Sequence, residues 1–252
     1  MEVMVVGKLK KTATIVQARM GSTRLPGKVM KQLQGESVLG HVIERLKQSE
    51  LLDEIIIATT KLDKDNIIAE EASNYNVNFY RGSEENVLSR YYYSAKENSV
   101  DIIVRITSDC PLIDPLLVDE IIQFYKKNNY KLVTNAGPNS ENRTYPRGLD
   151  VEVFSFELLK EAFNNATKYY QLEHVTPYIY ENIEEIYYYK NEVDYSNYRW
   201  TLDEKEDFEL IKSIYDKLYN GEHNFYSNKV LELMKQNPEL KKINSNVKQK
   251  QI

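Results

Sequence analysis

Cysteine is nearly absent from this sequence, and long apolar runs are missing. Cys110 is the single cysteine among 252 residues, so no disulfide can form within the chain. This fits a reducing compartment such as the cytoplasm. No apolar stretch reaches the about 20 residues that a transmembrane helix needs. The first residues, "MEVMVVGKLKK", lack a signal-peptide layout because their short apolar part precedes the lysines. We therefore expect a soluble cytoplasmic protein without membrane contact.

An excess of positive charge and a group of closely spaced histidines are also missing. The formal net charge is -5 and the isoelectric point is about 5.5, which argues against nucleic-acid binding through a broad basic face. His41, His174 and His223 are scattered, and with a single cysteine they argue against a zinc site. The sequence identifies no partner for His41 or His223. Cys110 is expected to be a small buried side chain rather than a nucleophile.

The first half of the sequence alternates strand and helix patterns, and its length suits one large α/β domain. Short β-branched runs predict strands at residues 12–18, 53–60, 77–82, 101–109 and 130–135. Apolar residues at helical spacing predict helices at residues 37–49, 64–74, 83–98 and 114–128. Ser37 and Ser83 are expected N-caps, and Pro115 suits a first helical turn. This order predicts a mostly parallel sheet with helices on both faces, which binds ligands outside the carboxyl ends of its strands.

The second half begins with a loop at residues 137–150, judged by its composition. Further strands are expected at residues 149–154, 185–191 and 198–203. Further helices are expected at residues 155–166, 171–183, 204–219 and 227–237, and Pro177 interrupts the second of them. The polar tail from about residue 240 is expected to fray. We expect one domain at residues 1–240, followed by a polar tail at residues 241–252.

The stretch "ATIVQARMGSTRLPGKVM" at residues 13–30 places three cations on a glycine-containing loop after the first strand. It is not a P-loop, because five residues separate Gly21 from Gly27 and Lys28 is followed by valine. It does not match G-x-G-x-x-G either. A solvated surface loop is the simpler interpretation, but the position at a strand's carboxyl end favours polyphosphate binding by Arg19, Arg24 and Lys28.

This stretch resembles the N-terminal signature of the cytidylyltransferase family, which includes the CMP-sialate and CMP-Kdo synthetases. The matching residues are Ala18, Arg19, Ser22, Arg24, Pro26 and Lys28. The stretches "RGSEENVLSRYY", "RITSDCPLIDP", "GLDVEVFS", "EHVTPYIY" and "RWTLDEKEDFELI" are most similar to the spore coat polysaccharide biosynthesis protein F branch. Together the stretches span about residues 13 to 212. The resemblance implies a Rossmann-like nucleotidyltransferase (nucleotide-diphospho-sugar transferase) fold, which agrees with the α/β pattern.

Two aspartates are candidate metal ligands. Asp109 ends the expected strand at residues 101–109, and Mg²⁺ is usually held by one or two carboxylates plus substrate phosphates. Taken alone, Asp109 would more often be a turn residue and Asp203 a helix cap. The resemblance implies metal binding by both. Ser108 stands where the branch usually has glycine. Asp207 is expected to be a surface charge that favours the helix dipole.

The resemblance also implies the nucleotide and substrate sites. The nucleotide-binding candidates are Gln17, Ala18, Arg19, Gly21, Ser22, Arg24, Lys28, Arg81, Gly82, Ser83 and Asp109. Among them Arg19, Lys28 and Asp109 are the catalytic candidates. The substrate-binding candidates are Arg147, Asp150, Glu173 and His174, although His174 also suits an ordinary helix position. The acceptor-binding and dimerisation part is expected at about residues 137–200, with "YYYK" at residues 187–190 in a dimer arm.

The function that the resemblance implies is a CTP-dependent nucleotidyltransferase. With Mg²⁺ as cofactor, it would join CMP to a sugar, sugar acid or sugar phosphate and release pyrophosphate. The product would serve surface or spore-coat polysaccharide synthesis, and the enzyme would act as a homodimer. The alternative is a glycosyltransferase of the same pathway type, whose D-x-D motif would be Asp63-Lys64-Asp65. Those aspartates fall in a turn entering a helix, and that alternative leaves the three loop cations unexplained. A non-catalytic scaffold is the third alternative. The sequence names neither the acceptor nor a strict preference for CTP.

Overall fold

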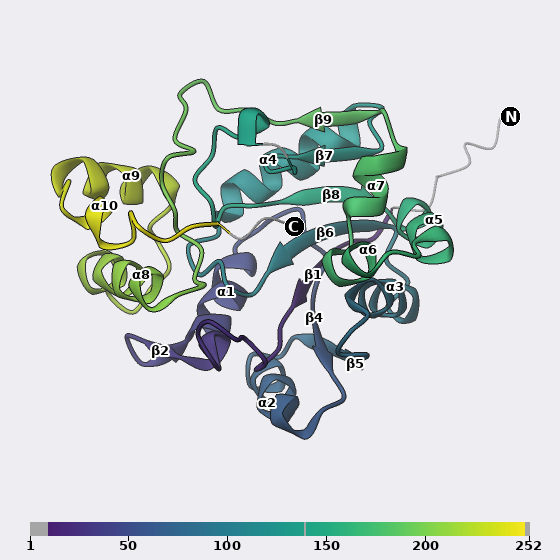
Figure 1. Cartoon of the computed structure of the whole chain (residues 1–252), viewed down its shortest axis with the longest axis horizontal. Coiled ribbons are helices and arrows are strands. Elements are labelled where there is room, and N and C mark those ends of the chain that lie inside the picture. Colours follow the sequence, from purple (N-terminus) through teal and green to yellow (C-terminus); the bar gives the residue numbers. More distant parts are fainter. Residues whose placement is uncertain (1–9, 139, 250–252) are drawn as a thin grey trace, which may run out of the picture.

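A computed structural model describes residues 10–138 and 140–249, and its centre is a seven-stranded sheet (Figure 1). The strand order is β5-β4-β1-β6-β8-β7-β9. The strands are β1 (Thr12–Gln17), β4 (Glu54–Thr60), β5 (Asn78–Gly82), β6 (Ile102–Thr107), β7 (Leu132–Thr134), β8 (Glu152–Ser155) and β9 (Ile186–Tyr188). All neighbouring pairs are parallel except those of β8, which runs antiparallel to β6 and β7. The expected mostly parallel sheet is confirmed.

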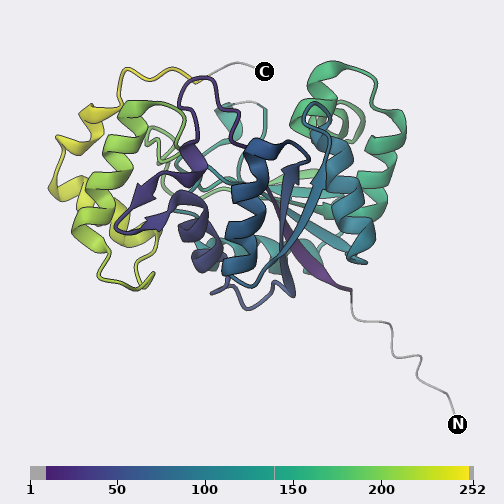
Figure 2. The same ribbon diagram turned by 90° about the horizontal axis from the view of Figure 1, so that it is seen from below.

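Helices cover both faces of this sheet (Figures 1 and 2). One face packs against α1 (Val38–Leu46), α2 (Asn66–Asn74) and α4 (Pro115–Lys127). The other packs against α3 (Val87–Glu97), α5 (Phe156–Asn165) and α7 (Pro177–Asn182), with α6 (Tyr169–His174) beside α3. Neighbouring strand residues point to opposite cores, as Ile15 and Val16 of β1 do. The two apolar layers fix the strand ends in space.

The C-terminal helices form a group beside α1 (Figure 1). They are α8 (Lys205–Leu218), α9 (Ser227–Gln236) and α10 (Leu240–Ile243). The buried Arg45 of α1 ties this group to the sheet, because it donates hydrogen bonds to the carbonyls of Ile113 and Phe225, each at 2.7 Å. Leu240 is buried and Asn244 donates a hydrogen bond to Asp207 (2.9 Å). The expected fraying from residue 240 is therefore wrong for this first part of the tail.

Two short elements connect β1 to α1. They are the 3-10 helix η1 (Lys28–Met30) and a ribbon of β2 (Gln32–Leu33) and β3 (Glu36–Ser37). The Ser37 side chain accepts a hydrogen bond from the Gly40 N–H (2.8 Å), so the expected N-cap of α1 is confirmed. Pro115 begins α4 as expected.

Other local expectations were wrong. Asn86 caps α3 by accepting from the Ser89 N–H (2.8 Å), while the expected cap Ser83 lies in the preceding turn. Residues 198–203 form no strand, because their pairing in the described chain is limited to one bridge between Arg147 and Arg199. Residues 1–9, on which the signal-peptide prediction rests, lie outside the described residues. Across the residues that the structure describes, no helix has both the length and the apolar character to cross a membrane.

Candidate active site

The carboxyl ends of β1 and β6 lie side by side because these strands are neighbours in the sheet. The loop after β1 begins at Ala18, whose N–H donates to the carbonyl of Ala58 (3.2 Å) in β4. The turn after β6 is held against β1 by a hydrogen bond from the Ser108 N–H to the Gln17 carbonyl (3.4 Å). The cationic loop and Asp109 therefore meet at the edge where parallel sheets bind ligands.

A tight turn in the cationic loop positions Lys28. The Met20 carbonyl accepts hydrogen bonds from the N–H groups of Ser22 (2.9 Å) and Gly27 (3.2 Å), which closes the loop. Gly27 has a φ of 65°, in the left-handed region that glycine adopts at little cost. A Cβ at this position would lie 3.1 Å from Met20 Cε. Glycine at position 27 thus lets the chain enter η1 with Lys28 facing the strand ends.

The Lys28 ammonium lies between two carboxylates. Its Nζ is 2.7 Å from Asp109 Oδ2 and 2.8 Å from Asp203 Oδ1. The three side chains are 12%, 21% and 15% exposed, respectively. Burial by itself would lower the pKa of Lys28, but the two carboxylates outweigh it and raise that pKa above its ordinary value. Both predicted metal-binding aspartates thus converge on one cation, supplied by the predicted phosphate-binding loop.

Asp203 is surrounded by further cations. Its Oδ2 accepts a hydrogen bond from Arg199 Nη2 (2.8 Å) and lies 3.1 Å from Arg24 Nη2. Burial by itself would raise the pKa of Asp203, but Lys28 and the two arginines outweigh it and lower that pKa to about 2. The carboxylate is therefore ionised at neutral pH. The capping alternative is wrong, because Glu204 occupies the N-cap position of α8.

Asp207 supports this cluster from inside the fold, so its assignment as a surface charge was wrong. It is fully buried. Its carboxylate accepts hydrogen bonds from the N–H groups of Asp203 (3.0 Å) and Glu204 (3.1 Å) and from Arg199 Nε (2.9 Å). The Asn244 side chain donates a further one at 2.9 Å. Sequence reasoning missed the pair of Arg199 and Asp207, and among the bonds named here only the one from Asn244 comes from a distant segment.

Asp109 is oriented by its neighbours. Thr107 Oγ1 donates a hydrogen bond to Asp109 Oδ1 (2.6 Å), and the Asp109 carbonyl accepts one from the Leu202 N–H (2.8 Å). The second bond ties together the two segments that carry the carboxylates. Cys110 is buried as expected. Its burial, and to a smaller extent the charge of Asp109, raises the pKa of its thiol well above the ordinary value. A protonated, buried thiol is a poor nucleophile.

The other two loop cations lie further out. Arg24 also pairs with Glu204 (3.0 Å), and a third of its side chain is exposed, 33%. Arg19 pairs instead with Glu173 at 3.8 Å, so it stands apart from the Lys28 cluster. The other Glu173 oxygen lies 3.8 Å from His174 Nε2, so two substrate-binding candidates lie next to one nucleotide-binding candidate. Exposed pairs of this kind contribute only about 0–1 kcal/mol, which leaves both arginines available to an anionic ligand.

The loop also rests on the connection between β4 and α2. The Met20 N–H donates to Asp65 Oδ1 (2.7 Å), and the Thr60 hydroxyl donates to the other oxygen of this fully buried carboxylate. Asp65 is therefore committed to holding the chain. This removes the structural support for a D-x-D metal motif at residues 63–65. A Cβ on Gly21 would lie 3.2 Å from Lys64 Nζ, so this glycine allows a close approach.

Arg81, Gly82 and Ser83 shape the junction between β5 and α3. Arg81 donates hydrogen bonds to the carbonyls of Thr60 (2.8 Å) and Leu62 (3.0 Å). A Cβ on Gly82 would lie 2.9 Å from carbon atoms of both Arg90 and Tyr80, and Ser83 Oγ accepts from the Asn86 N–H (3.1 Å). Their side-chain bonds serve the fold, so nucleotide contacts from this turn stay a prediction.

Two polar side chains near the strand ends have unused hydrogen-bonding groups. The Gln17 side-chain oxygen is buried and has no hydrogen-bond partner among the described residues. Among the described residues, the Arg147 guanidinium makes no hydrogen bond and no close ion pair, although the Asp150 carboxylate acts on it electrostatically. Burial, followed by the Arg143 charge, lowers the pKa of Arg147. Asp150 pairs with Arg143 through both carboxylate oxygens, and its predicted contact with the substrate stays a prediction.

Arg147 also lines a cavity of about 370 Å³. Its other basic residues are Arg199, which bonds Asp203, and Lys241. The cavity therefore combines three cationic side chains and adjoins the carboxylate cluster. Such a lining suits an anionic ligand.

Comparisons of this chain with known proteins agree on one protein family. The cytidylyltransferase family model matches residues 13–243. An uncharacterized protein of Methanocaldococcus jannaschii is 40% identical, covering 94% of this chain and 95% of its own. The spore coat polysaccharide biosynthesis protein SpsF of Bacillus subtilis is 31% identical, with 89% and 94% covered. A 3-deoxy-manno-octulosonate cytidylyltransferase of Geotalea daltonii is 37% identical over 44% of each chain.

Solved structures agree with these sequence relatives. A cytidylyltransferase from Leptospira borgpetersenii serovar Hardjo-bovis superposes with a TM-score of 0.86 at 35% identity, covering 96% of this chain and 99% of its own. A CMP:2-keto-3-deoxy-manno-octonic acid synthetase complexed with CTP has a TM-score of 0.63 at 17% identity, covering 82% and 99%. The second likeness concerns the fold alone. The expected Rossmann-like nucleotidyltransferase fold is confirmed.

Proposed function

This chain belongs to the cytidylyltransferase family, and from that premise we propose that it transfers the CMP group of CTP to an anionic sugar acceptor. An oxygen of the acceptor forms a bond to the α-phosphorus of CTP, the bond from that phosphorus to the pyrophosphate oxygen breaks, and pyrophosphate leaves. If the attacking oxygen is a hydroxyl, its proton is released. The observation that carries the proposal is the placement of Lys28 between Asp109 and Asp203 at the carboxyl ends of the sheet.

Mg²⁺ suits the two carboxylates. Asp109 and Asp203 each place one oxygen within 2.8 Å of the same ammonium, so they already face a single positive charge. We infer that these two residues would hold Mg²⁺ together with phosphate oxygens of the nucleotide. When bound, the ion would neutralise charge on the α-phosphate and on the leaving pyrophosphate.

The chain's own cations would bind and orient the triphosphate. Lys28 would move from the carboxylates to the phosphates as a point charge, since its stem is flexible. Arg24 and Arg19 would exchange their exposed carboxylate partners for phosphate oxygens, which arginine can hold bidentately. The unpartnered Gln17 oxygen and the backbone around Ala18 suit contacts to the base. Catalysis of this kind depends on positioning and electrostatic stabilisation rather than on a covalent intermediate.

An anionic acceptor is supported by the cavity beside the cluster. Arg147 lines it with no close ion pair in the described chain and interacts with Asp150 only at longer range, so its guanidinium suits a carboxylate or phosphate of a sugar. Glu173 and His174 would contact the acceptor beside Arg19. The Geotalea relative is named for a sugar acid, and the Bacillus relative for spore-coat polysaccharide synthesis. We therefore propose that the product is a CMP-activated sugar acid or sugar for surface polysaccharide synthesis. We also propose, because the family resemblance implies it, that the enzyme acts as a homodimer in the cytoplasm.

The experiment is a pyrophosphate-release assay with four nucleoside triphosphates against sugar phosphates and ulosonic acids. CTP should be the preferred nucleotide with at least one acidic sugar. Asp109→Asn should lower turnover by about 10²–10³, the scale of losing one charge-stabilising group at a reacting phosphate. The matched control is Asp216→Asn, which changes an exposed aspartate on α8. Full activity of Asp109→Asn would remove the metal role, and stabilisation by UDP with Mn²⁺ rather than by CTP would favour a glycosyltransferase.

The acceptor proposal has its own variant. Arg147→Gln should raise the KM for the acidic acceptor and leave the KM for CTP unchanged, because Arg147 is assigned to the acceptor cavity. Rescue of that KM by Arg147→Lys would mark a charge effect. An unchanged acceptor KM in Arg147→Gln would move the acceptor to another surface.

A further inference from the structure

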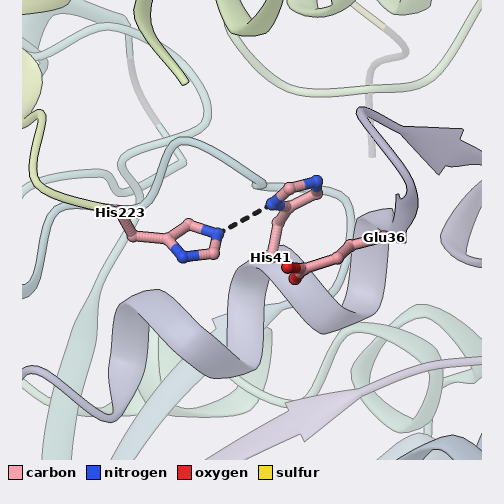
Figure 3. A group of neighbouring side chains, drawn as sticks. All are labelled: Glu36, His41 and His223. Atoms are coloured by element: carbon pink, nitrogen blue, oxygen red, sulfur yellow. Dashed lines mark hydrogen bonds between the residues drawn. The ribbon is translucent and has the colours of Figure 1, made fainter. Parts of the chain in front are cut away.

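Two histidines that are distant in sequence meet outside the candidate active site. His41 on α1, His223 between α8 and α9, and Glu36 on β3 form what we call the histidine cluster (Figure 3). His41 Nδ1 lies 2.7 Å from His223 Nε2 although the residues are 182 positions apart. The ligand atoms of all three residues lie within 4.8 Å of one another. The sequence identified no partner for His41 or His223, and the structure shows that they pair with each other.

The proton on His41 can be placed from its surroundings. His41 Nε2 lies 2.7 Å from the Leu33 carbonyl, and a carbonyl oxygen can only accept a hydrogen bond. The neutral His41 ring therefore carries its hydrogen on Nε2 and directs the lone pair of Nδ1 toward His223. A histidine that ligates a metal through one ring nitrogen usually donates the N–H of its other ring nitrogen to a group such as a backbone carbonyl.

The other two members are also held by the surrounding protein. The Glu36 oxygens accept hydrogen bonds from the hydroxyl groups of Tyr219 (2.8 Å) and Tyr75 (3.2 Å). The His223 carbonyl accepts one from the Gln48 side chain (3.1 Å). These contacts orient the carboxylate and fix the backbone that carries His223. They form the outer layer of hydrogen bonds that positions ligands in metal sites.

We propose that the histidine cluster binds a divalent transition metal, with zinc as the ion that it fits best. Two imidazoles and one carboxylate are a known three-residue set for zinc, with a further position for water. Imidazole nitrogen suits zinc, whereas Mg²⁺ takes oxygen ligands, so this site and the carboxylate pair would select different ions. Binding would require the neutral His223 ring to change tautomer, moving its hydrogen from Nε2 to Nδ1, so that the Nε2 lone pair faces the metal and no net proton is lost.

The geometry needs only a local adjustment. Two nitrogens bound to one tetrahedral zinc stand about 3.3 Å apart, so the rings would separate by roughly 0.6 Å. His223 is only partly buried and lies between two helices, which permits such a shift. The site would tie the β2–β3 ribbon and α1 to the loop after α8. It would thereby fix α8, the helix that carries Asp207 beneath Asp203.

The test uses the full chain, freed of metal with a chelator and then titrated with Zn²⁺ or Co²⁺ in excess Mg²⁺. We expect one tightly bound equivalent, the visible spectrum of tetrahedral Co²⁺, and a higher melting temperature with zinc. His223→Gln should abolish the spectrum and the zinc-induced rise in melting temperature. The control Glu222→Gln changes an exposed neighbour and should retain both. His174 stays unchanged in every variant, so binding there would not differ between them.

A second variant separates a metal site from a hydrogen-bonded histidine pair. Tyr219→Phe removes an outer contact of Glu36 and should weaken zinc binding about 10–100-fold. If His223→Gln does not fold, Glu36→Gln provides the loss-of-ligand variant. If the unaltered chain binds zinc no more tightly than His223→Gln does, the proposal is overturned and the cluster is a simple histidine pair. None of these measurements uses a nucleotide, so they stand or fall independently of the transferase reaction.

Discussion

Replacing Asp203 with asparagine tests the electrostatics of the carboxylate cluster in the folded protein. The pKa of Asp203 is lowered from 3.8 to about 2, because Lys28, Arg24 and Arg199 outweigh its burial. A carboxyl group with a lower pKa in the folded state stabilises that state above its unfolded pKa, and the contribution is lost as the pH falls. The shift corresponds to about 2 kcal/mol at neutral pH. For a chain of this size, Asp203→Asn should lower the melting temperature by roughly 4–8 °C at pH 7.

The pH dependence makes this prediction specific. The stability gap between the unaltered chain and Asp203→Asn should keep nearly its full size at about pH 5 and fall to about half by pH 3. Urea unfolding across this range measures it. The control is Asp216→Asn. Because the ion-pair partner of Asp216, Lys212, is 55% exposed, this substitution should lower the free energy of unfolding by less than about 0.5 kcal/mol. An equal melting temperature at pH 7, or a gap that stays constant down to pH 3, would refute the reasoning.

Three other substitutions test separate parts of the structure. Asp207→Asn disrupts the buried pair that positions Asp203, so it should destabilise the chain by about 3–5 kcal/mol in urea unfolding. It should also lower turnover, and normal turnover would contradict the positioning role. Glu152→Gln should lower the free energy of unfolding by about 3 kcal/mol, since it leaves the largely buried Arg105 without a counter-charge. A loss below about 1 kcal/mol would count against that pair. Cys110→Ala should keep CTP-dependent pyrophosphate release, whereas a large loss would reopen a role for the thiol.

The sheet and its ligand-binding edge could be predicted because local patterns determine them. The β-branched runs at β1, β4 and β6 and the apolar spacing in α1 and α4 specify a βαβ sheet without any distant contact. The edge where Lys28 meets Asp109 then follows from strand order. The family resemblance, which includes "RWTLDEKEDFELI", supplied the predicted metal-binding role of Asp203, whose own neighbourhood in sequence would assign it to a helix cap.

The rest depends on contacts between segments that no local pattern reveals. Asp207 has the spacing of an exposed first-turn acid, yet Arg199 and Asn244 bury it. His41 and His223 are each isolated in the sequence, and only the packing of α8 beside α1 brings them together. Residues 198–203 have the composition of a strand, but the bond from Leu202 to Asp109 holds them as a connecting segment.

The hydrogen bond from Asn244 to Asp207 has a consequence for the order in which the candidate active site is assembled during synthesis. Ribosomes deliver the chain from its N-terminus, so Lys28 and Asp109 emerge long before Asn244. The acid that aligns Asp203 gains this amide donor only when the segment after α9 has docked. A nascent chain could therefore form its sheet early and still lack an aligned carboxylate pair. Shortening the chain at residue 240 would preserve that immature state, with an assembled core and a misaligned centre.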